Sequence, residues 1–287
     1  MSCFDLNNRN SGECLQNTGY AVGGLISADP FEIAKADLDS KAAIDALIVA
    51  SSGRIIPLID EEYYESISQR EAVTKETTNG ITKNLGITGH SFKVSEDNPG
   101  WYSIQKAILD GSQSAVVYVI LIKSKGFYEG NSPDGSLSVK GRKMQLFKSV
   151  MEAEDNATNQ MLEWTFTELQ PALNLEQMWF GKPDTYSPLE LLGVNDVNLE
   201  VTTSIATSIT AVVSKKERAG SYPTQLAVAN FELLDSTGAA QTISGVSYSN
   251  GVYTLTGTGL VSGTLRVIPV VGDTLFYESD YVDVTIA

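Results

Sequence analysis

The sequence is poor in the residues that most often carry chemistry. Its 287 residues include one histidine and two cysteines. A single imidazole cannot build a histidine metal site, and two thiols cannot form a disulfide framework. We interpret His90, in ITGHSFKV, as structural or solvated, because a catalytic role would need Ser91 or a distant carboxylate as partner. Cys3 and Cys14 are expected to be free thiols, with a local bridge or a tether to a neighbouring subunit as the alternatives.

The chain also lacks excess positive charge and long apolar runs. Its formal net charge is −15, so affinity for nucleic acid through phosphate neutralisation is disfavoured. The longest apolar stretch, AVVYVILI at 115–122, fits a buried strand and is too short to span a bilayer. The polar start, MSCFDLNNRN, has no basic and apolar pattern of a secretory signal. We therefore expect no membrane partner.

Acidic residues are abundant but form no recognisable site. Clusters occur at 60–62, 96–97 and 152–155, and none follows the calcium-loop pattern. The glycines match neither a P-loop nor a dinucleotide fingerprint. We therefore predict no catalytic residue, no metal ligand and no cofactor. A hydrolase that uses a carboxylate pair, drawn from Glu61, Glu62 or Asp97, is the enzymatic alternative.

The first 190 residues alternate strand patterns with a few helical ones. Asp39 or Ser40 is suited to cap a helix that ends before Gly53. GWYSIQKAILDG, at 100–111, predicts a second short helix that leads into the buried strand at 115–122. SPDGSLSVKGRKMQLF predicts a turn at 133–135 followed by a strand.

A hairpin is predicted from Glu71 to Lys93. Charged and β-branched residues alternate along SQREAVTKETTNG, and the Asn79-Gly80 dipeptide is a strong two-residue turn signal. We expect this arm to pair with the sheet edge of a neighbouring subunit, as in strand augmentation. Its candidate assembly residues are Glu71, Lys75, Asn79, Gly80, Lys83 and Lys93. An ordinary solvent-exposed hairpin is the alternative.

The final ninety residues contain seven strand-length runs and no convincing helix. The segment GKPDTYSPLELLGVND, at 181–196, contains two prolines and two glycines and places a domain boundary around 185–196. Seven short strands in this length are typical of an immunoglobulin-like sandwich, here without its disulfide. The expected core is apolar: Val212, Leu226, Val228, Phe231, Tyr253, Leu255, Leu265, Val267, Val282 and Val284.

Four patterns between residues 28 and 180 resemble the tail tube-type proteins of tailed bacteriophages, particularly those that infect Bacteroidetes. They are the strand and helix FEIAKADLDSKAAIDALI, the hairpin EAVTKETTNGITKNLGI, the helix GWYSIQKAILDG before AVVYVILI, and the S-P-D-G turn before LSVKGRKMQLF. The resemblance does not separate a tube subunit from a ring or adaptor protein.

The resemblance implies a mainly β chain with three parts. These are an N-terminal arm at 1–26, a tail-tube-like sandwich or barrel with one or two flanking helices at 27–185, and an immunoglobulin-like domain at 196–287. It further implies a virion tail protein, assembled in the host cytoplasm, that forms homo-oligomeric rings and contacts neighbouring tail proteins. Genomic DNA would pass through without specific binding, which an acidic lumen permits.

The main alternative is a bacterial surface adhesin or glycan-binding module made of two β domains. Under either hypothesis the C-terminal domain has tyrosines suited to contact host-surface glycan. These are Tyr222, Tyr248, Tyr277 and Tyr281. Half-buried sandwich positions are the other interpretation of these tyrosines.

Overall fold

The chain is mainly β, as predicted, with 51% strand and 11% helix. The computed structural model describes residues 19–59, 64–68, 71–76, 78, 82–96, 114–147, 162–216 and 220–286. Two compact units divide the chain between Leu191 and Leu192, inside the Pro- and Gly-containing segment at 185–196. Unit 1 ends at Leu191 and unit 2 begins at Leu192, and each unit is described separately below.

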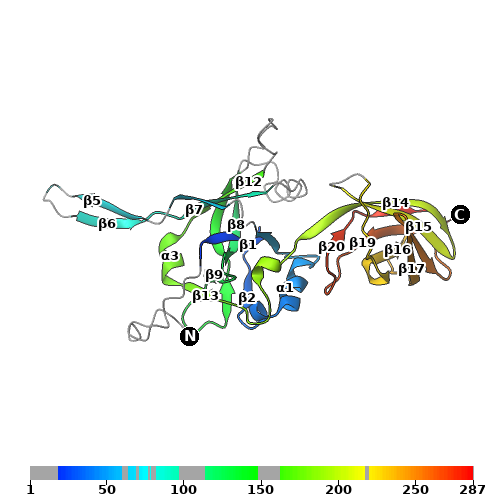
Figure 1. Ribbon diagram of the computed structural model, residues 1–287, viewed down its shortest axis with the longest axis horizontal. Coiled ribbons are helices and arrows are strands. Elements are labelled where there is room, and N and C mark those ends of the chain that lie inside the picture. The colour runs from blue at the N-terminus through cyan, green and yellow to red at the C-terminus, as the bar shows by residue number, and fades with distance from the viewer. Residues whose placement is uncertain are drawn as a thin grey trace. The chain divides into compact units, whose positions relative to one another are not determined.

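Unit 1 contains thirteen of the described strands, two α-helices and two short 3₁₀ turns (Figure 1). The strands are β1 (Ala21–Ser27), β2 (Glu32–Ala34), β3 (Ile56–Ile59), β4 (Tyr64–Ser68), β5 (Ala72–Glu76), β6 (Thr82–Ile87), β7 (Ser91–Glu96), β8 (Ser114–Lys123), β9 (Tyr128–Asn131), β10 (Ser138–Lys140), β11 (Arg142–Phe147), β12 (Leu162–Glu168) and β13 (Met178–Gly181). The helices are α1 (Lys41–Ile48) and α3 (Pro171–Glu176), and the 3₁₀ turns are η2 (Asp37–Asp39) and η3 (Pro188–Glu190).

An 11-stranded half-barrel sheet organises unit 1. Its main path runs β2-β10-β9-β8-β11-β12-β7-β4. Strand β1 pairs antiparallel with both β3 and β8, and β13 pairs with β9. Every strand pairing in this sheet is antiparallel, so strands that are neighbours in sequence join by short turns wherever the sheet order allows.

Alternation of side chains gives the sheet one apolar face. On β11 the buried residues Met144 and Leu146 alternate with Lys143, Gln145 and Phe147, which retain exposure. The buried face also includes Trp164 and Phe166 from β12 and Phe92 from β7. The period-two alternation of Leu162, Trp164 and Phe166 with polar residues in LEWTFTE predicts this face. Strand β8 differs, because both of its faces are buried from Val119 to Ile122, where β1 and β9 flank it.

Local signals account for the helix and the tight strand contact in unit 1. The Ser40 hydroxyl accepts a hydrogen bond from the Ala43 amide at 3.3 Å, so Ser40, and not Asp39, caps α1. Gly23 in β1 has φ +154°, and a Cβ there would lie 1.9 Å from the Leu58 carbonyl oxygen. Only glycine therefore lets β1 approach β3 this closely.

Two further sequence expectations have definite outcomes. The turn at 133–135 is present, with the Ser136 amide bonded to the Pro133 carbonyl at 2.9 Å and Gly135 at φ +77°. The run that follows splits into β10 and β11 at Gly141. The helix predicted at 100–111 and the N-terminal arm up to residue 18 lie outside the described residues.

Unit 2 is a two-sheet β-sandwich. Its strands are β14 (Val194–Ile205), β15 (Ser208–Lys215), β16 (Phe231–Asp235), β17 (Ile243–Ser249), β18 (Val252–Gly257), β19 (Gly263–Val267), β20 (Phe276–Glu278) and β21 (Val282–Val284), with one 3₁₀ turn, η4 (Val228–Asn230). The sheets have the orders β17-β18-β15-β14-β20 and β16-β19-β21. If β14 to β19 are lettered A to F and β20–β21 is G, these orders become D-E-B-A-G and C-F-G. When β20 and β21 are both counted as G, these two sheets contain the orders A-B-E-D and C-F-G that describe immunoglobulin constant-type sandwiches.

The core of unit 2 follows the predicted positions closely. Seven of the ten predicted residues are buried, and Val228 and Val282 pack against them from partly buried positions. Val212 was predicted wrongly: it faces outward, while its neighbours Ala211 and Val213 point into the core. The seven-strand count also missed β20, a three-residue strand that pairs in parallel with the start of β14.

Candidate assembly interface

Strand β5 of the β5–β6 hairpin is exposed along its whole length. All five residues of β5 are exposed, and β5 and β6 form a two-stranded sheet of their own. Figure 1 shows the hairpin extending beyond the other strands of its unit. Reciprocal bonds close its base, where the Glu71 amide donates to the Thr88 hydroxyl and the Thr88 amide donates to the Glu71 carbonyl, both at 2.8 Å. An isolated two-stranded hairpin is only marginally stable in water, so this element gains most from a partner strand.

The register of the hairpin places two candidate residues opposite each other. Lys75 pairs with Lys83, and the next pairs are Glu76 with Thr82 and Thr74 with Asn84. Like charges directly opposite on neighbouring strands are destabilising. The pairing of Lys75 with Lys83 therefore adds no favourable cross-strand charge pair to the hairpin.

The remaining candidate residues separate. Glu71 lies at the base of the hairpin, whereas Lys93 lies in β7 of the large sheet, opposite Thr165 of β12 and Glu65 of β4. The hairpin is thus shorter than predicted, because the chain leaves it at Ile87 and re-enters the main sheet at Ser91. Asn79 and Gly80 lie outside the described residues.

A buried polar cluster links several strands of the large sheet of unit 1. Arg142, which is fully buried, forms an ion pair with Glu129, and its Nε donates to Asn131 Oδ1 at 3.2 Å. Asn131 Nδ2 donates to Asn174 Oδ1 at 2.7 Å, and Asn174 Nδ2 donates to Glu168 Oε1 at 3.0 Å. This chain of contacts joins β9, β11, β12 and α3.

The charges of this cluster balance. Lys123 Nζ lies 2.9 Å from Glu129 Oε2, and Arg142 Nη1 lies 3.8 Å from Glu168 Oε1, so two cations meet two carboxylates. Burial alone would raise the pKa of Glu129, but Arg142 and Lys123 outweigh burial and lower it to about 2. Sequence reasoning missed this cluster, because its members are separated by up to fifty residues and match no motif.

His90 takes a structural position next to the cluster. Its backbone amide donates to Glu168 Oε2 at 3.1 Å, and its ring stacks on Phe92 with centroids 5.5 Å apart. The Ser91 hydroxyl bonds to the Thr167 hydroxyl at 3.0 Å, across the strand pair. This geometry fits the structural interpretation of His90.

The last residues of unit 1 are hydrogen-bonded to its earlier elements. The Tyr186 hydroxyl donates to the Leu38 carbonyl at 3.1 Å and lies 2.6 Å from the Tyr128 hydroxyl, which therefore donates to it. The Asp184 amide donates to Asp39 Oδ1 at 2.7 Å. Burial raises the pKa of Tyr186 to about 12 and raises that of Tyr128 further, so both stay protonated donors.

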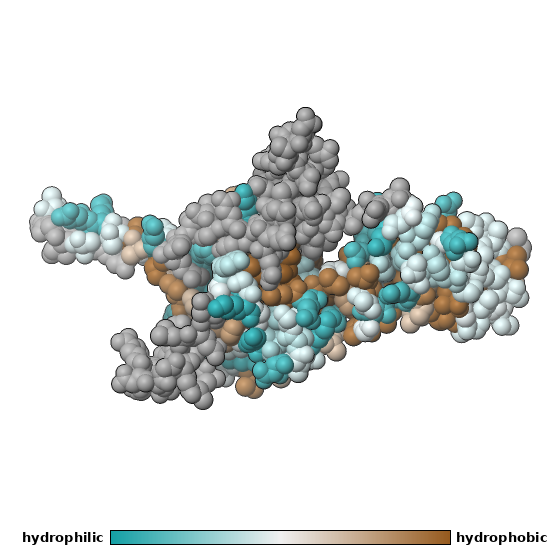
Figure 2. Space-filling view, in the orientation of Figure 1, coloured by the Kyte–Doolittle hydropathy of each residue, from teal (hydrophilic) through white to brown (hydrophobic). Residues whose placement is uncertain are grey.

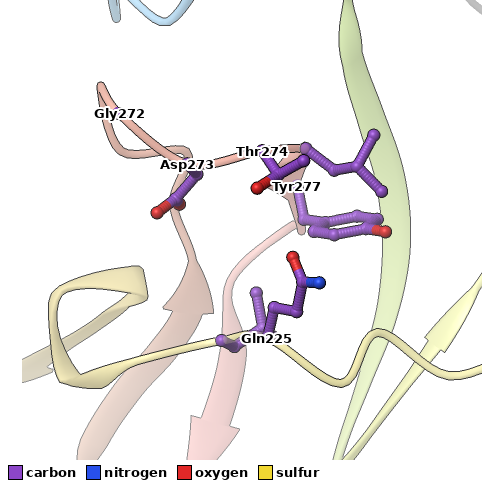
Figure 3. Close-up of a pocket in the computed structure, with 7 residues that line it drawn as sticks. Gln225, Gly272, Asp273, Thr274 and Tyr277 are labelled. Atoms are coloured by element: carbon purple, nitrogen blue, oxygen red, sulfur yellow. The ribbon is translucent and has the colours of Figure 1, made fainter.

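Unit 2 contains a small polar pocket of about 220 Å³ (Figure 3). Its lining residues are Gln225, Leu226, Gly272, Asp273, Thr274, Leu275 and Tyr277. In Figure 3 the Gln225 amide points toward Thr274 and Tyr277, while the Asp273 carboxylate points away from them. Asn230 fixes that carboxylate, since its Nδ2 donates to Asp273 Oδ2 at 2.7 Å and its Oδ1 accepts from the Ala227 amide at 2.8 Å.

The tyrosines expected to contact glycan divide into two groups. Tyr222, Tyr248 and Tyr281 are exposed, whereas Tyr277 is 5% exposed and belongs to the core of the sandwich. Tyr277 therefore follows the other interpretation of these tyrosines, a position within the sandwich, although it also lines the pocket. The Tyr281 ring lies under the Arg266 guanidinium at 4.5 Å, and its hydroxyl donates to Glu232 Oε2 at 2.7 Å.

The described residues contain neither a candidate metal site nor a candidate membrane-spanning helix. No group of three or more His, Cys, Asp or Glu side chains in this part of the chain could hold a metal ion. None of the helices described here is long and apolar enough to cross a membrane. The acidic residues at 60–62 and Asp97 lie outside the described residues.

Comparison with known proteins assigns no family. No family model matches the chain, and no curated protein matches it.

Proposed function

We propose that this chain is a virion structural protein of a tailed bacteriophage, not an enzyme, that assembles into rings of the tail or tail tube. The observation that carries the proposal is the β5–β6 hairpin, which is exposed along β5, pairs with no other described strand and sets Lys75 opposite Lys83. Strand exchange between subunits would pair its edge and surround the lysines with carboxylates. Unit 1 would then be the ring-forming part, and unit 2 an attached immunoglobulin-like domain.

The proposed conduit for DNA agrees with the overall charge. A protein of net charge −15 repels a passing polyanion and does not grip it. The outward face of β11 offers Lys143, Gln145 and Phe147 and contains no carboxylate. An acidic lumen would therefore use other surfaces of unit 1, and the face of β11 would meet protein.

The test is the solution mass of the full chain, measured by light scattering on a sizing column with negative-stain images of the same peak. We expect rings at a multiple of 30.9 kDa. The Lys75→Glu, Lys83→Glu double variant should form no rings, because carboxylates would then face the carboxylates of the neighbour. The control is Lys125→Glu, Lys140→Glu, which makes the same charge change at exposed lysines of unit 1 outside the hairpin. A monomeric native chain contradicts the ring, and rings in the hairpin variant contradict the role of the hairpin.

The alternative, an adhesin or glycan-binding module, draws support from the pocket in unit 2. Its amide, hydroxyl and carboxylate groups are those that bind sugar hydroxyls, and Asn230 preorders Asp273. A glycan array with the full chain tests this alternative. Binding that is lost in Gln225→Ala and kept in Asp283→Ala, an exposed control outside the pocket, would favour the adhesin.

A further inference from the structure

Strand β17 differs from every other edge strand of unit 2. Each of the other edge strands contains acidic residues. Strand β16 has Glu232 and Asp235, β20 has Glu278, and β21 has Asp283. Strand β17, ISGVSYS, contains no charged residue and no proline, and among the described residues it pairs with β18 alone. Charges and prolines on edge strands are the usual protection against pairing with another chain.

The absence of charge extends well beyond β17. No Asp, Glu, Lys, Arg or His occurs from Ser236 to Leu265, a run of 30 residues in a chain that is 19% charged. At that average about six charged residues would be expected. In Figure 2 the part of unit 2 where Figure 1 labels β17 is mostly pale, between the hydrophilic and hydrophobic extremes. Unit 2 has 9 acidic and 4 basic residues, so this neutral region is a local exception on an acidic surface.

The shape of β17 leaves a regular segment for pairing. A register shift between Ile243 and Gly245 disturbs the start of the strand, after which Val246, Ser247, Tyr248 and Ser249 stay in regular register with β18. Ser247 and Ser249 are exposed. The five residues from Gly245 to Ser249 are close to the usual length of a strand.

We propose that β17 is a pairing edge whose partner is β17 of a second copy of this chain. Antiparallel pairing about a two-fold axis at Ser247 would join the two five-stranded sheets into one continuous sheet. A second copy is the favoured occupant because the uncharged edge is where two chains of net charge −15 can approach each other with the least repulsion. Such a contact closes on itself, so it joins two copies and then stops. It is independent of the proposed ring, because it uses unit 2 alone.

Symmetry makes the proposal testable by cross-linking. In this register Ser247 lies directly opposite Ser247 of the second copy, with Cα atoms about 4.5–5.5 Å apart, which suits a disulfide. Ser244 is also exposed but would lie about 20 Å from its own copy, at 3.4 Å per residue. The matched variants are therefore Ser247→Cys and Ser244→Cys, each in a chain with Cys3→Ser and Cys14→Ser.

The readout is the band at twice 30.9 kDa on a non-reducing gel after mild oxidation of the full chain. We expect about tenfold more of this dimer from Ser247→Cys than from Ser244→Cys, because only the first pair meets the geometry of a disulfide. Equal yields from the two variants would overturn the proposal. Equal yields are also the result expected if β17 binds another protein or a glycan and not a second copy.

A charge on the edge gives a second, independent test. Ser247→Lys would set two lysines opposite each other and should weaken the dimer about tenfold in light scattering. Asn198→Lys adds the same charge at an exposed position on β14, away from β17, and should leave the dimer unchanged. Both are measured in the Lys75→Glu, Lys83→Glu chain, so that ring assembly does not contribute to the mass. A dimer that tolerates Ser247→Lys would contradict the proposal.

Discussion

At the scale of single residues, the cluster around Arg142 buries several charged side chains together. A fully buried guanidinium is costly to desolvate and is tolerated only with close partners. Glu129 forms ion pairs with two cations, Arg142 and Lys123, and Asn131 accepts a hydrogen bond from Arg142 Nε. Arg142 Nη2 is buried without a hydrogen-bond partner. Loss of Glu129 would therefore remove the nearest carboxylate of both Lys123 and Arg142.

We predict that Glu129→Gln lowers the free energy of unfolding of unit 1 by about 3 kcal/mol, as for other buried pairs that lose one member. All three tryptophans, Trp101, Trp164 and Trp179, lie in unit 1, so their fluorescence during urea unfolding reports on this unit. Glu32→Gln is the control, because the Glu32–Lys140 pair is exposed with 3.9 Å between its charged atoms and should contribute little. Equal changes in the free energy of unfolding for the two variants would contradict the predicted contribution of the buried cluster to stability.

The same carboxylate predicts a dependence on pH. The folded-state pKa of Glu129 is about 2 and its ordinary value is 4.5, so its stabilisation is complete above pH 4.5. It is lost as the pH falls from 4.5 toward 2. The stability difference between native protein and Glu129→Gln should therefore be constant from pH 5 to 7 and shrink below pH 4.5. Urea titrations followed by tryptophan fluorescence at each pH measure this difference, and a constant difference down to pH 2.5 would contradict it.

At the scale of elements, capping decides where α1 begins. The sequence offered Asp39 and Ser40 as alternative caps for α1. In the structure Asp39 is the last residue of the 3₁₀ turn η2, and Ser40 is the N-cap residue of α1. We predict that Ser40→Ala destabilises unit 1 by about 1 kcal/mol, while Ser40→Asp retains the cap and the stability. Tryptophan fluorescence in urea again provides the measurement. An equal loss in both variants would show that the hydroxyl hydrogen bond is not the source.

Elements with strong local patterns were predictable, and those that depend on distant contacts were not. The hairpin, the turn at 133–135 and the alternation of Trp164 and Phe166 follow from period and turn chemistry. Strand β20 and the inward position of Tyr277 depend on pairing with β14, some eighty residues away. Val212 failed by one residue, since three apolar residues in a row, Ala211 to Val213, do not fix the phase of a strand.

The candidate site was only partly readable from sequence. The hairpin was found because Asn-Gly between alternating runs is a local signal. The sequence could not predict that Lys75 lies opposite Lys83. The register of a hairpin depends on its turn and on any bulge, and here a bulge lies between Val73 and Thr74. The buried cluster was invisible, since a lone Arg or Glu in a strand pattern is normally read as exposed.

At the scale of the whole molecule, each unit has its own core. The sandwich core of unit 2 includes Leu255, which is fully buried. We predict that Leu255→Ala lowers the free energy of unfolding of unit 2 by about 3 kcal/mol, in the range for buried leucines. Far-UV circular dichroism should then resolve an early transition, while the tryptophan fluorescence transition of unit 1 stays in place. A shift of both transitions together would mean that the units unfold as one.

The parallel pairing at the start of unit 2 has a mechanical consequence. Val194, Asn195 and Asp196 enter the unit hydrogen-bonded to Phe276, Tyr277 and Glu278, which lie near its exit. Tension applied between the two ends would pull these parallel strands in opposite directions along their length. The bonds between them would then be loaded in shear and would have to break together, whereas a hairpin pulled at its open end breaks one bond at a time. Force applied through the ends of this sandwich therefore loads the β14–β20 pairing in shear, in addition to the pairing of β21 with β19.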